Sequence, residues 1–329
     1  MPVKKILKKI LIKLCRICGY EIIDQSQFSF PSLKNKKFNN LSTINNKSIV
    51  FPLGEVKISK KVQSLGIIIR TNSNIHISDQ NKKRIFNKDK IEYIKKSLKS
   101  LVNSINYFEE KIGKVKINIT IIDQSNNEYI LQEFSKIFLN LSFKPKIIKF
   151  DKNELKDEIK VNTQKDIFGN LSSLLRCFKI AKESNDDLIF FLEDDYIHKK
   201  SLIEEMVLTF ERVASQIYKE VILVPSDYPF LYMNERETKV IAGSHRHWQT
   251  LDKVLCSFMT SKEIIETYWN NFLLTCQNDN EPIEKYLNQI CEKEVCLSPI
   301  PSLSIHMANA NSIFGVSPYI DIKKEWENN

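Results

Sequence analysis

Three acidic residues directly follow a run of apolar ones in the stretch DDLIFFLEDDY. Leu188 to Leu192 are apolar, which predicts a strand buried on both faces, and Glu193, Asp194 and Asp195 come next. Carboxylates packed this closely repel one another unless a positive charge lies among them. Hard divalent cations take oxygen ligands, so we expect a cation here. A solvated acidic loop is the ordinary alternative for an isolated acidic run.

Two earlier apolar segments also end in polar residues suited to binding. Residues 65–69 are followed by Arg70, Thr71 and Asn72, and residues 117–122 by Asp123. In open α/β sheets ligands bind at the carboxyl ends of the strands. We therefore expect Asp123 and the three acids to converge on one nucleotide-plus-metal site.

The elements that must position these residues alternate along the chain. The expected strands span 65–69, 117–122, 146–150, 188–192 and 221–224, and the expected helices span 89–108, 128–139, 170–183 and 201–219. This order predicts right-handed crossovers and a mainly parallel α/β sheet with helices on both faces. Asn170 is expected to cap the third helix, after a turn at Gly169.

Charge and motifs exclude several classes of protein. The net charge is +9, yet residues 1–61 hold thirteen Lys or Arg against three Asp or Glu, so the rest of the chain is close to neutral. Nucleic-acid binding is therefore not expected, because it calls for a basic stripe on the folded domain. The sequence has neither a G-x-G-x-x-G turn nor a G-K-[ST] loop, which argues against nicotinamide enzymes and P-loop ATPases. The odd count of seven cysteines indicates reduced thiols in a cytosolic protein.

The ends of the chain differ from the body in composition. Residues 1–24 predict a basic amphipathic helix that lies on an anionic membrane surface, with packing on its own domain as the alternative. The longest apolar run falls short of the ~18 residues that a membrane span needs. Residues 25–61 are expected to be a linker or irregular extension, 62–310 the main domain and 311–329 a C-terminal tail.

The order of these pieces resembles a glycosyltransferase of the GT-A fold, nearest to family two. The matching pieces are IIIRTNSN, ITIIDQSNN, FGNLSSLLRCFKIA and DLIFFLEDDY, which together cover about residues 65–210. The resemblance implies a Rossmann-like α/β fold, a nucleotide-sugar donor and a divalent cation, Mn²⁺ or Mg²⁺.

The resemblance also implies roles for individual residues. The implied donor-binding residues are Arg70, Thr71, Asn72, Asp123, Gly169, Asn170, Glu193 and Asp194. Asp123 would contact the base or ribose, and Asp195 would be a metal ligand. Arg70 stands where relatives often have proline, and its guanidinium is suited to pairing with phosphate. Relatives often return a C-terminal His to the metal, and His306 matches that position.

The second half of the chain suggests acceptor contacts and a proton acceptor. Asp227 and Tyr228 follow a strand, which suits contact with a sugar or simple loop anchoring. His245 and His247 alternate as on a strand, so acceptor or diphosphate contact at His247 and Trp248 competes with structural hydrogen bonding.

Inverting enzymes of this type need a carboxylate base near a helix start. We name Glu281 and Asp279 for this role, because both lie at the start of an expected helix over 277–290. Stabilisation of the helix dipole is the competing explanation for acids at this position.

The sequence thus favours an enzyme of the glycosyltransferase class that moves a sugar from a nucleotide-sugar to an acceptor hydroxyl of a glycan or lipid-linked acceptor. Surface glycan or lipopolysaccharide synthesis at the cytoplasmic membrane face is the expected setting. A sugar nucleotidyltransferase is the first alternative, although RTNSNIHIS is poor in the glycines such an enzyme would need. A non-catalytic, membrane-associated scaffold with the same fold is the second.

Overall fold

A computed structural model describes most of the chain. The described residues are 2–20, 47–50, 54–73, 85–124, 127–164, 167–233, 237–277, 279–280, 282–307 and 312–329. The chain divides into two compact units, Met1–Asn39 and Asn40–Asn329. The first unit contains the helix α1 (Pro2–Ile17).

A nine-stranded sheet in the order β5-β4-β3-β6-β11-β8-β12-β10-β9 forms the centre of the second unit. Its strands are β3 (Ser64–Thr71), β4 (Lys116–Asp123), β5 (Lys146–Lys149), β6 (Leu188–Glu193), β8 (Val221–Leu223), β9 (Val240–Ala242), β10 (His247–Thr250), β11 (Phe258–Ser261) and β12 (Val295–Ile300). β5, β4, β3 and β6 are parallel neighbours, and β12 is parallel to β8. β11 and β10 run antiparallel to the strands beside them. The prediction of a mainly parallel α/β sheet is confirmed.

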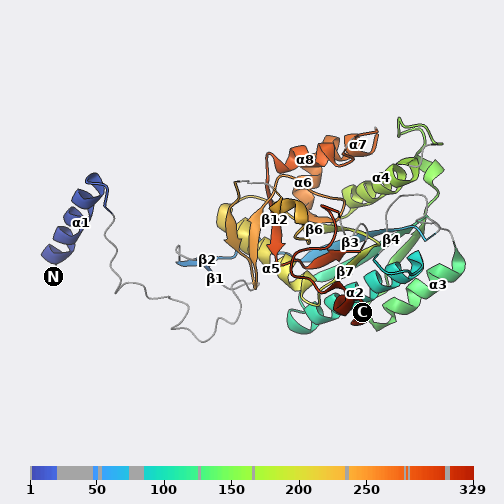
Figure 1. Cartoon of the computed structure of the whole chain (residues 1–329), viewed down its shortest axis with the longest axis horizontal. Helices are drawn as coiled ribbons and strands as arrows, with labels where there is room; N and C mark the ends of the chain where they lie inside the picture. The colour runs from blue at the N-terminus through green and yellow to red at the C-terminus, as the bar shows by residue number, and fades with distance from the viewer. Residues whose placement is uncertain are drawn as a thin grey trace. The chain divides into compact units, whose positions relative to one another are not determined.

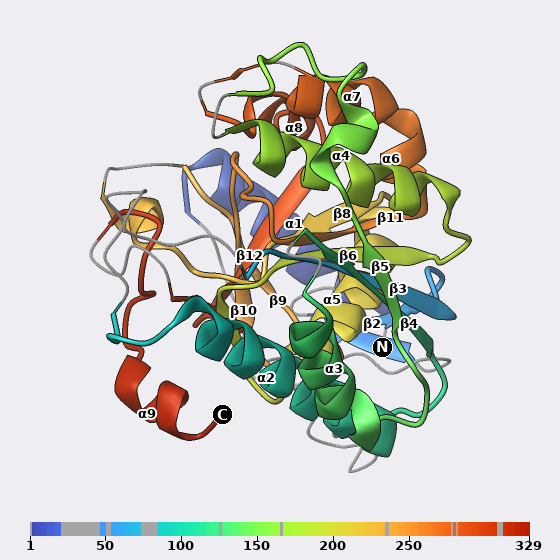
Figure 2. The same cartoon turned by 90° about the vertical axis from the view of Figure 1, so that its right-hand side faces the viewer.

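Helices cover both faces of this sheet, as predicted (Figures 1 and 2). On one face α2 (Lys90–Lys111), α3 (Glu128–Ile137) and α5 (Leu202–Ile217) bury an apolar core against the strands. On the other face lie α4 (Ile167–Glu183), α6 (Lys262–Thr267), α7 (Trp269–Gln277) and α8 (Lys285–Cys291). Short 3₁₀ turns occur at Phe138–Asn140, Lys152–Leu155 and Pro229–Tyr232.

Burial on both faces explains the unbroken apolar run of β6. Residues 188–192 are all buried, and alternate side chains join the two cores. Phe190 belongs to the core under α2 and α5, whereas Phe191 packs edge-on against Phe178 of α4. Because both faces of β6 pack against apolar cores, polar side chains fit only at the end of the strand.

Register fixes which polar residues meet at the carboxyl edge. β3 lies between β4 and β6, and its last residues pair Thr71 with Asp123 and Arg70 with Glu193. The three strand ends thus open together, because parallel strands in register end at the same edge.

A second, two-stranded sheet continues from this edge. β7 (Tyr196–His198) pairs antiparallel with β13 (Ser304–His306), so that Tyr196 lies opposite His306 and His198 opposite Ser304. The C-terminal segment follows and ends in α9 (Ile322–Glu327). Its Trp326 ring packs on Phe86 and Tyr93 at 4.6 Å between centroids in each case.

Several expectations about local structure need correction. α4 begins at Ile167, so Asn170 lies inside the helix and does not cap it. The segment holding His245 is a turn closed by Gly243 N–H donating to the Arg246 carbonyl, so His245 and His247 do not alternate on one strand. α8 begins at Lys285, later than expected, because Pro282 and the next residues form a turn.

The expected linker contains regular structure. β1 (Lys47–Val50) and β2 (Gly54–Lys57) form an antiparallel pair. Just after it, Ile58 and Val62 are each 1% exposed. The N–H groups of Ser59 and Lys60 donate to Ser215 Oγ on α5, which ties this stretch to the second unit.

Among the described residues, no helix is both long enough and apolar enough to cross a membrane.

Candidate active site

The candidate site lies at the carboxyl edge where β3, β4 and β6 end. Thr71 Oγ1 donates to Asp123 Oδ1 at 2.8 Å, and the Asn72 N–H donates to Asp194 Oδ2 at 3.0 Å. Asp123 is fully buried and Asp194 is 7% exposed. The end of β3 thus joins acids from two other strands, and the expected convergence of Asp123 and the 193–195 stretch is present.

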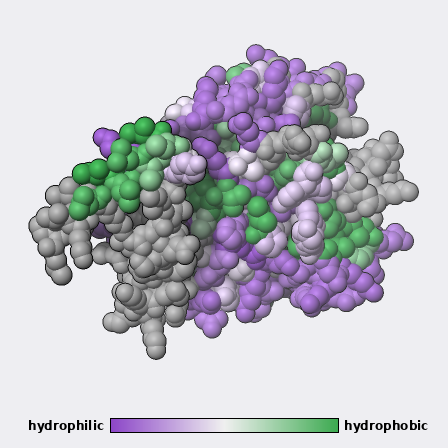
Figure 3. Space-filling view, turned by 60° about the vertical axis from the view of Figure 1, so that its left-hand side comes forward, coloured by the Kyte–Doolittle hydropathy of each residue, from purple (hydrophilic) through white to green (hydrophobic). Residues whose placement is uncertain are grey.

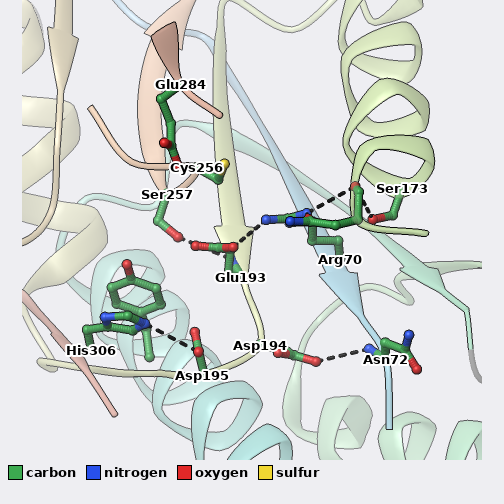
Figure 4. A network of polar contacts seen from close by, with 12 residues as sticks. Arg70, Asn72, Ser173, Glu193, Asp194, Asp195, Cys256, Ser257, Glu284 and His306 are labelled. Atoms are coloured by element: carbon green, nitrogen blue, oxygen red, sulfur yellow. Dashed lines mark hydrogen bonds and ion pairs between the residues drawn. The ribbon is translucent and has the colours of Figure 1, made fainter. Parts of the chain in front are cut away.

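Arg70 is held inside the protein by two partners (Figure 4). Its guanidinium donates to Glu193 Oε1 and to Asn170 Oδ1. The Glu193 N–H in turn donates to Ser257 Oγ at 3.1 Å. Both predicted donor-binding residues Arg70 and Glu193 are therefore paired with each other, and the pair fixes the end of β6 against α4.

Gln124 connects the remaining predicted donor residues. Its Nε2 donates to the Gly169 carbonyl at 2.6 Å, and its Oε1 accepts from Asn72 Nδ2 at 3.1 Å. Gln124 directly follows Asp123 in the sequence, a position that marks it as a strand-end residue, yet the sequence analysis passed over it.

Lys90 is another residue that the sequence analysis missed. It is the first residue of α2, and its Nζ lies 3.2 Å from Asp194 Oδ2. Burial raises the pKa of Asp194, while the Lys90 charge opposes that effect and the Asp195 charge adds to it. A cation from the protein thus already balances one of the adjacent acids.

Asp195 and His306 form the second part of the site. His306 Nε2 lies 3.3 Å from Asp195 Oδ2. Burial works against both charges, yet the attraction between the two groups holds the pKa of Asp195 at about 2 and raises the pKa of His306 to about 9. Tyr196 stacks on the imidazole, with 4.7 Å between ring centroids, and restricts its orientation.

This pair fits a divalent cation as two ligands of a larger set. Asp195 Oδ1 is buried and has no hydrogen-bond partner among the described residues. His306 Nδ1 bonds to the Phe314 carbonyl at 2.7 Å, which leaves Nε2 facing Asp195. Such a hydrogen bond is typical of metal-binding histidines, because it fixes the ring and the tautomer. Within the described ranges no group of three His, Cys, Asp or Glu residues is placed to hold a metal, so oxygens of a ligand would have to complete the coordination.

The predicted acceptor residues have different surroundings. The Asp227 carboxylate accepts from Tyr232 and Gln249, and Tyr228 Oη lies 2.7 Å from Tyr196 Oη. Trp248 is fully buried and donates from Nε1 to Glu205 Oε1 at 3.1 Å, which leaves no ring face for a sugar. His247 is exposed at the start of β10.

The structure describes one of the two predicted proton acceptors. Asp279 is exposed, and Glu281 lies outside the described residues. A carboxylate that the sequence analysis missed, Glu284, is the N-cap residue of α8. Figure 4 shows it next to Cys256 and above Glu193, and Cys256 Sγ lies 3.5 Å from its Oε1. Burial raises the pKa of Glu284, and the nearby Glu193 charge contributes to the rise.

Comparisons with known proteins give likeness in fold only. Neither protein-family models nor curated proteins match the chain. Among solved structures, S. aureus TarS matches at TM-score 0.35 and 12% identity over 62% of this chain and 29% of its own. The galactosyltransferase LgtC, solved with donor and acceptor sugar analogs, matches at 0.33 and 10% over 68% and 70%. GalNAc-T7 with UDP, GalNAc and Mn²⁺ matches at 0.43 and 10% over 74% and 43%.

A structure described by a different activity also matches. The 4-diphosphocytidyl-2C-methyl-D-erythritol synthase from Anaerococcus prevotii matches at TM-score 0.35 and 10% identity, over 74% of this chain and 88% of its own. The match covers less than a third of the TarS chain. At this level of likeness the matches assign no activity, and the site geometry must carry the functional argument.

Proposed function

We propose that the chain is a glycosyltransferase that uses a nucleotide-sugar donor and a divalent cation, Mn²⁺ or Mg²⁺. The observation that carries this proposal is that Asp123 and Asp194 both contact the end of β3, while Oδ1 of the adjacent Asp195 has no hydrogen-bond partner among the described residues. Buried carboxylates at a sheet edge suit a ligand that offers hydroxyl donors and a cation with phosphate oxygens.

The proposed roles follow from these positions. Asp123, with Thr71 and Asn72 beside it, borders the nucleoside, and Asp195 with His306 holds the cation. The cation, when bound, neutralises charge on the leaving diphosphate. Lys90 lies beside Asp194 and adds positive charge from the protein at the same edge. Arg70 acts through Glu193 and Asn170, so it is a positioning residue.

The transfer itself needs a proton acceptor. The acceptor oxygen bonds to the anomeric carbon as the bond from that carbon to the phosphate oxygen breaks, and the hydroxyl proton moves to a carboxylate. Asp279 and Glu281 stay candidates for this base. Glu284 is a third, because its raised pKa places it nearer to neutrality than an ordinary glutamate.

The basic helix α1 supports a place at an anionic membrane surface. Leu7, Ile10, Leu11, Leu14 and Ile17 are between 51% and 75% exposed. Figure 3 shows apolar side chains of this helix gathered in one green patch. Six Lys or Arg accompany them in the sequence, and such a helix binds acidic headgroups through charge and acyl chains through its apolar face. The proposed acceptor is accordingly a glycan or lipid-linked glycan.

The donor proposal is tested by thermal shift of the full chain with Mn²⁺ and UDP-, GDP-, CMP- or dTDP-sugars. We expect one nucleotide class to raise the Tm, and we expect Asp195→Asn to abolish that rise. A Tm that no nucleotide-sugar changes, or an equal rise in both proteins, would contradict the proposal. Release of pyrophosphate from a nucleoside triphosphate and a sugar phosphate would instead support the nucleotidyltransferase alternative.

A further inference from the structure

A basic hollow of about 450 Å³ is lined in part by Ser201 and Pro301, which lie three residues after β7 and three residues before β13 in the sequence. Its lining comes from the end of α2, the start of α5, the turn before β10 and the end of β12. The lining residues are Tyr107, Lys111, Ser201, Glu204, His245, Arg246, His247, Ile300 and Pro301. The expected acceptor residue His247 is among them.

The floor of this hollow is a buried carboxylate with an unused oxygen. Glu204 is 1% exposed, and its Oε1 accepts no hydrogen bond from the described residues. His245 Nε2 lies 3.7 Å and Lys111 Nζ 3.8 Å from this oxygen, which are ion-pair distances. The pairing with Glu204 raises the pKa of His245. A buried charge held only by loose ion pairs is costly unless a further donor reaches it.

The rim of the hollow is positive. Lys111 Nζ and Lys200 Nζ lie 4.5 and 4.9 Å from the centre of the Tyr107 ring, and Arg246 Nη1 donates to the Pro301 carbonyl at 3.1 Å. Glu204 is the only acid that lines the hollow among the described residues. The second unit as a whole is nearly neutral by sequence, so this local excess of cations is a distinct feature.

The turn that carries the cations is rigid. Glu205 accepts from the N–H groups of His245 and Arg246 and from Trp248 Nε1. A Cβ at Gly243 would lie 2.3 Å from the Trp248 ring, so only glycine permits the turn to close on this tryptophan. The backbone that carries His245 and Arg246 is therefore held in place by a buried network.

We propose that this hollow binds an acidic saccharide, a sugar that carries a phosphate or carboxylate group. Glu204 accepts a hydrogen bond from a sugar hydroxyl, while Lys111, Arg246 and the two histidines bind the anionic group. An inorganic anion alone does not satisfy this arrangement, because Glu204 repels it. A neutral sugar alone leaves the cations unused.

The hollow serves in this proposal as an acceptor subsite, and this role rests on the proposed function. The β7–β13 pair spans three residues, or roughly 7 Å at the rise of an antiparallel strand. His198 Nδ1 and Ser304 Oγ join the two strands at 2.8 Å, at the end of the pair opposite His306. The side chains of β7 and those of Ser304 and Ile305 are buried, so a glycan seated in the hollow reaches His306 over the surface beside this pair.

The binding test uses the full chain and ligand-observed NMR with glucose, inorganic phosphate, glucuronate and glucose 6-phosphate. We expect the two sugar acids to bind at least about tenfold more tightly than glucose or phosphate, because charged and neutral contacts act together. Arg246→Ala and Lys111→Ala should each weaken sugar-acid binding by roughly tenfold. Lys99→Ala, in a separate surface hollow, is the matched control and should change nothing.

Glu204→Gln distinguishes a ligand that carries both a hydroxyl and an anionic group from a simple anion. Loss of the negative charge should weaken sugar-acid binding but strengthen binding of inorganic phosphate. Phosphate that binds the wild-type protein as tightly as glucose 6-phosphate would indicate an adventitious ion only and overturn the proposal. Equal effects of Lys99→Ala and Arg246→Ala would overturn it too.

The two proposals fail separately. Asp195→Asn should leave sugar-acid binding in the hollow unchanged, because no described contact joins Asp195 to Glu204. If sugar acids bind but no nucleotide-sugar does, the hollow is confirmed as a sugar-acid site, but its role as an acceptor subsite is wrong. If a nucleotide-sugar binds but no sugar acid does, the hollow proposal is wrong and the donor proposal stands.

Discussion

The Arg70–Glu193 pair shows that residues expected to bind a ligand can instead stabilise the fold around the site. The Arg70 side chain is 13% exposed and that of Glu193 is 26% exposed, so neither charge is well solvated. Removing one partner leaves the other charge without compensation in a poorly solvated place.

We expect Arg70→Met to lower the free energy of unfolding by about 2–3 kcal/mol, because it leaves the Glu193 carboxylate without its ion-pair partner. Lys149→Met is the matched control. It breaks an ion pair with Glu128 in which both side chains are at least half exposed, so it should cost less than about 1 kcal/mol. Urea unfolding of both variants provides the measurement, and equal costs would show that Arg70 has no special structural role.

Glu284 offers a sharper test of the chemistry than the acids expected from sequence. We expect Glu284→Gln to lower kcat by roughly 100-fold or more with donor binding retained, because general-base catalysis contributes about that much. Asp279→Asn should lower kcat to this extent only if Asp279 is the base instead. Since burial raises the pKa of Glu284, the rate should rise with pH above the range of an ordinary glutamate, and that limb should vanish in the variant. A normal kcat in Glu284→Gln would remove it as the base.

At the scale of elements, α5 is unusual because it buries charged residues along its length. Glu204, Glu205, Glu211 and Arg212 are each at most 1% exposed. Glu205 holds the turn before β10 and Glu211 accepts from the Val62 N–H at 2.8 Å. α5 therefore fixes two loops through its carboxylates as well as packing on the sheet.

Glu211 makes the stability of the protein depend on pH. Burial raises its pKa from the ordinary 4.5 to about 7, so the folded protein holds this proton more tightly than the unfolded chain. The stabilisation is complete below pH 4.5 and is lost as pH rises toward 7, by about 3 kcal/mol at 1.36 kcal/mol per unit. Glu211→Gln should flatten this part of the stability profile in urea unfolding. Exposed Glu263 is the control, and a Glu263→Gln profile that flattens equally would contradict the assignment.

At the scale of the whole molecule, α1 and the second unit are expected to have separate tasks. Deleting residues 1–24 should reduce co-sedimentation with anionic liposomes by at least about tenfold, because apolar area and charge both contribute to binding. The Tm should stay unchanged, since the helix belongs to the first compact unit. Leu11→Asp with Leu14→Asp should reproduce the loss without shortening the chain. Unchanged liposome binding of the deleted protein would rule out the membrane role.

The sequence was sufficient to predict the sheet, because apolar residues recur at different spacings in strands and in helices. The unbroken apolar run of β6 also indicated burial on both faces. It also predicted that Asp123 and the acids after β6 would meet, since parallel strands end at one edge. The strand order and the insertion of antiparallel β11 depend on contacts between distant segments, which local pattern does not encode. The same reason explains why Lys90 and Glu284 were missed. Each looks like an ordinary helix-start residue until the fold brings it to the site.

The short β7–β13 pair has one more consequence. If the hollow and the Asp195–His306 site bind opposite parts of one acceptor, the buried backbone of the β7–β13 pair helps to fix the distance between these two parts. A ligand much shorter than this stretch of backbone would reach the cation-bearing rim or the transfer point, but not both at once. Main-chain geometry would then select the length of the acceptor. Substitutions of side chains in the hollow would change which acidic sugars bind without changing the preferred acceptor length.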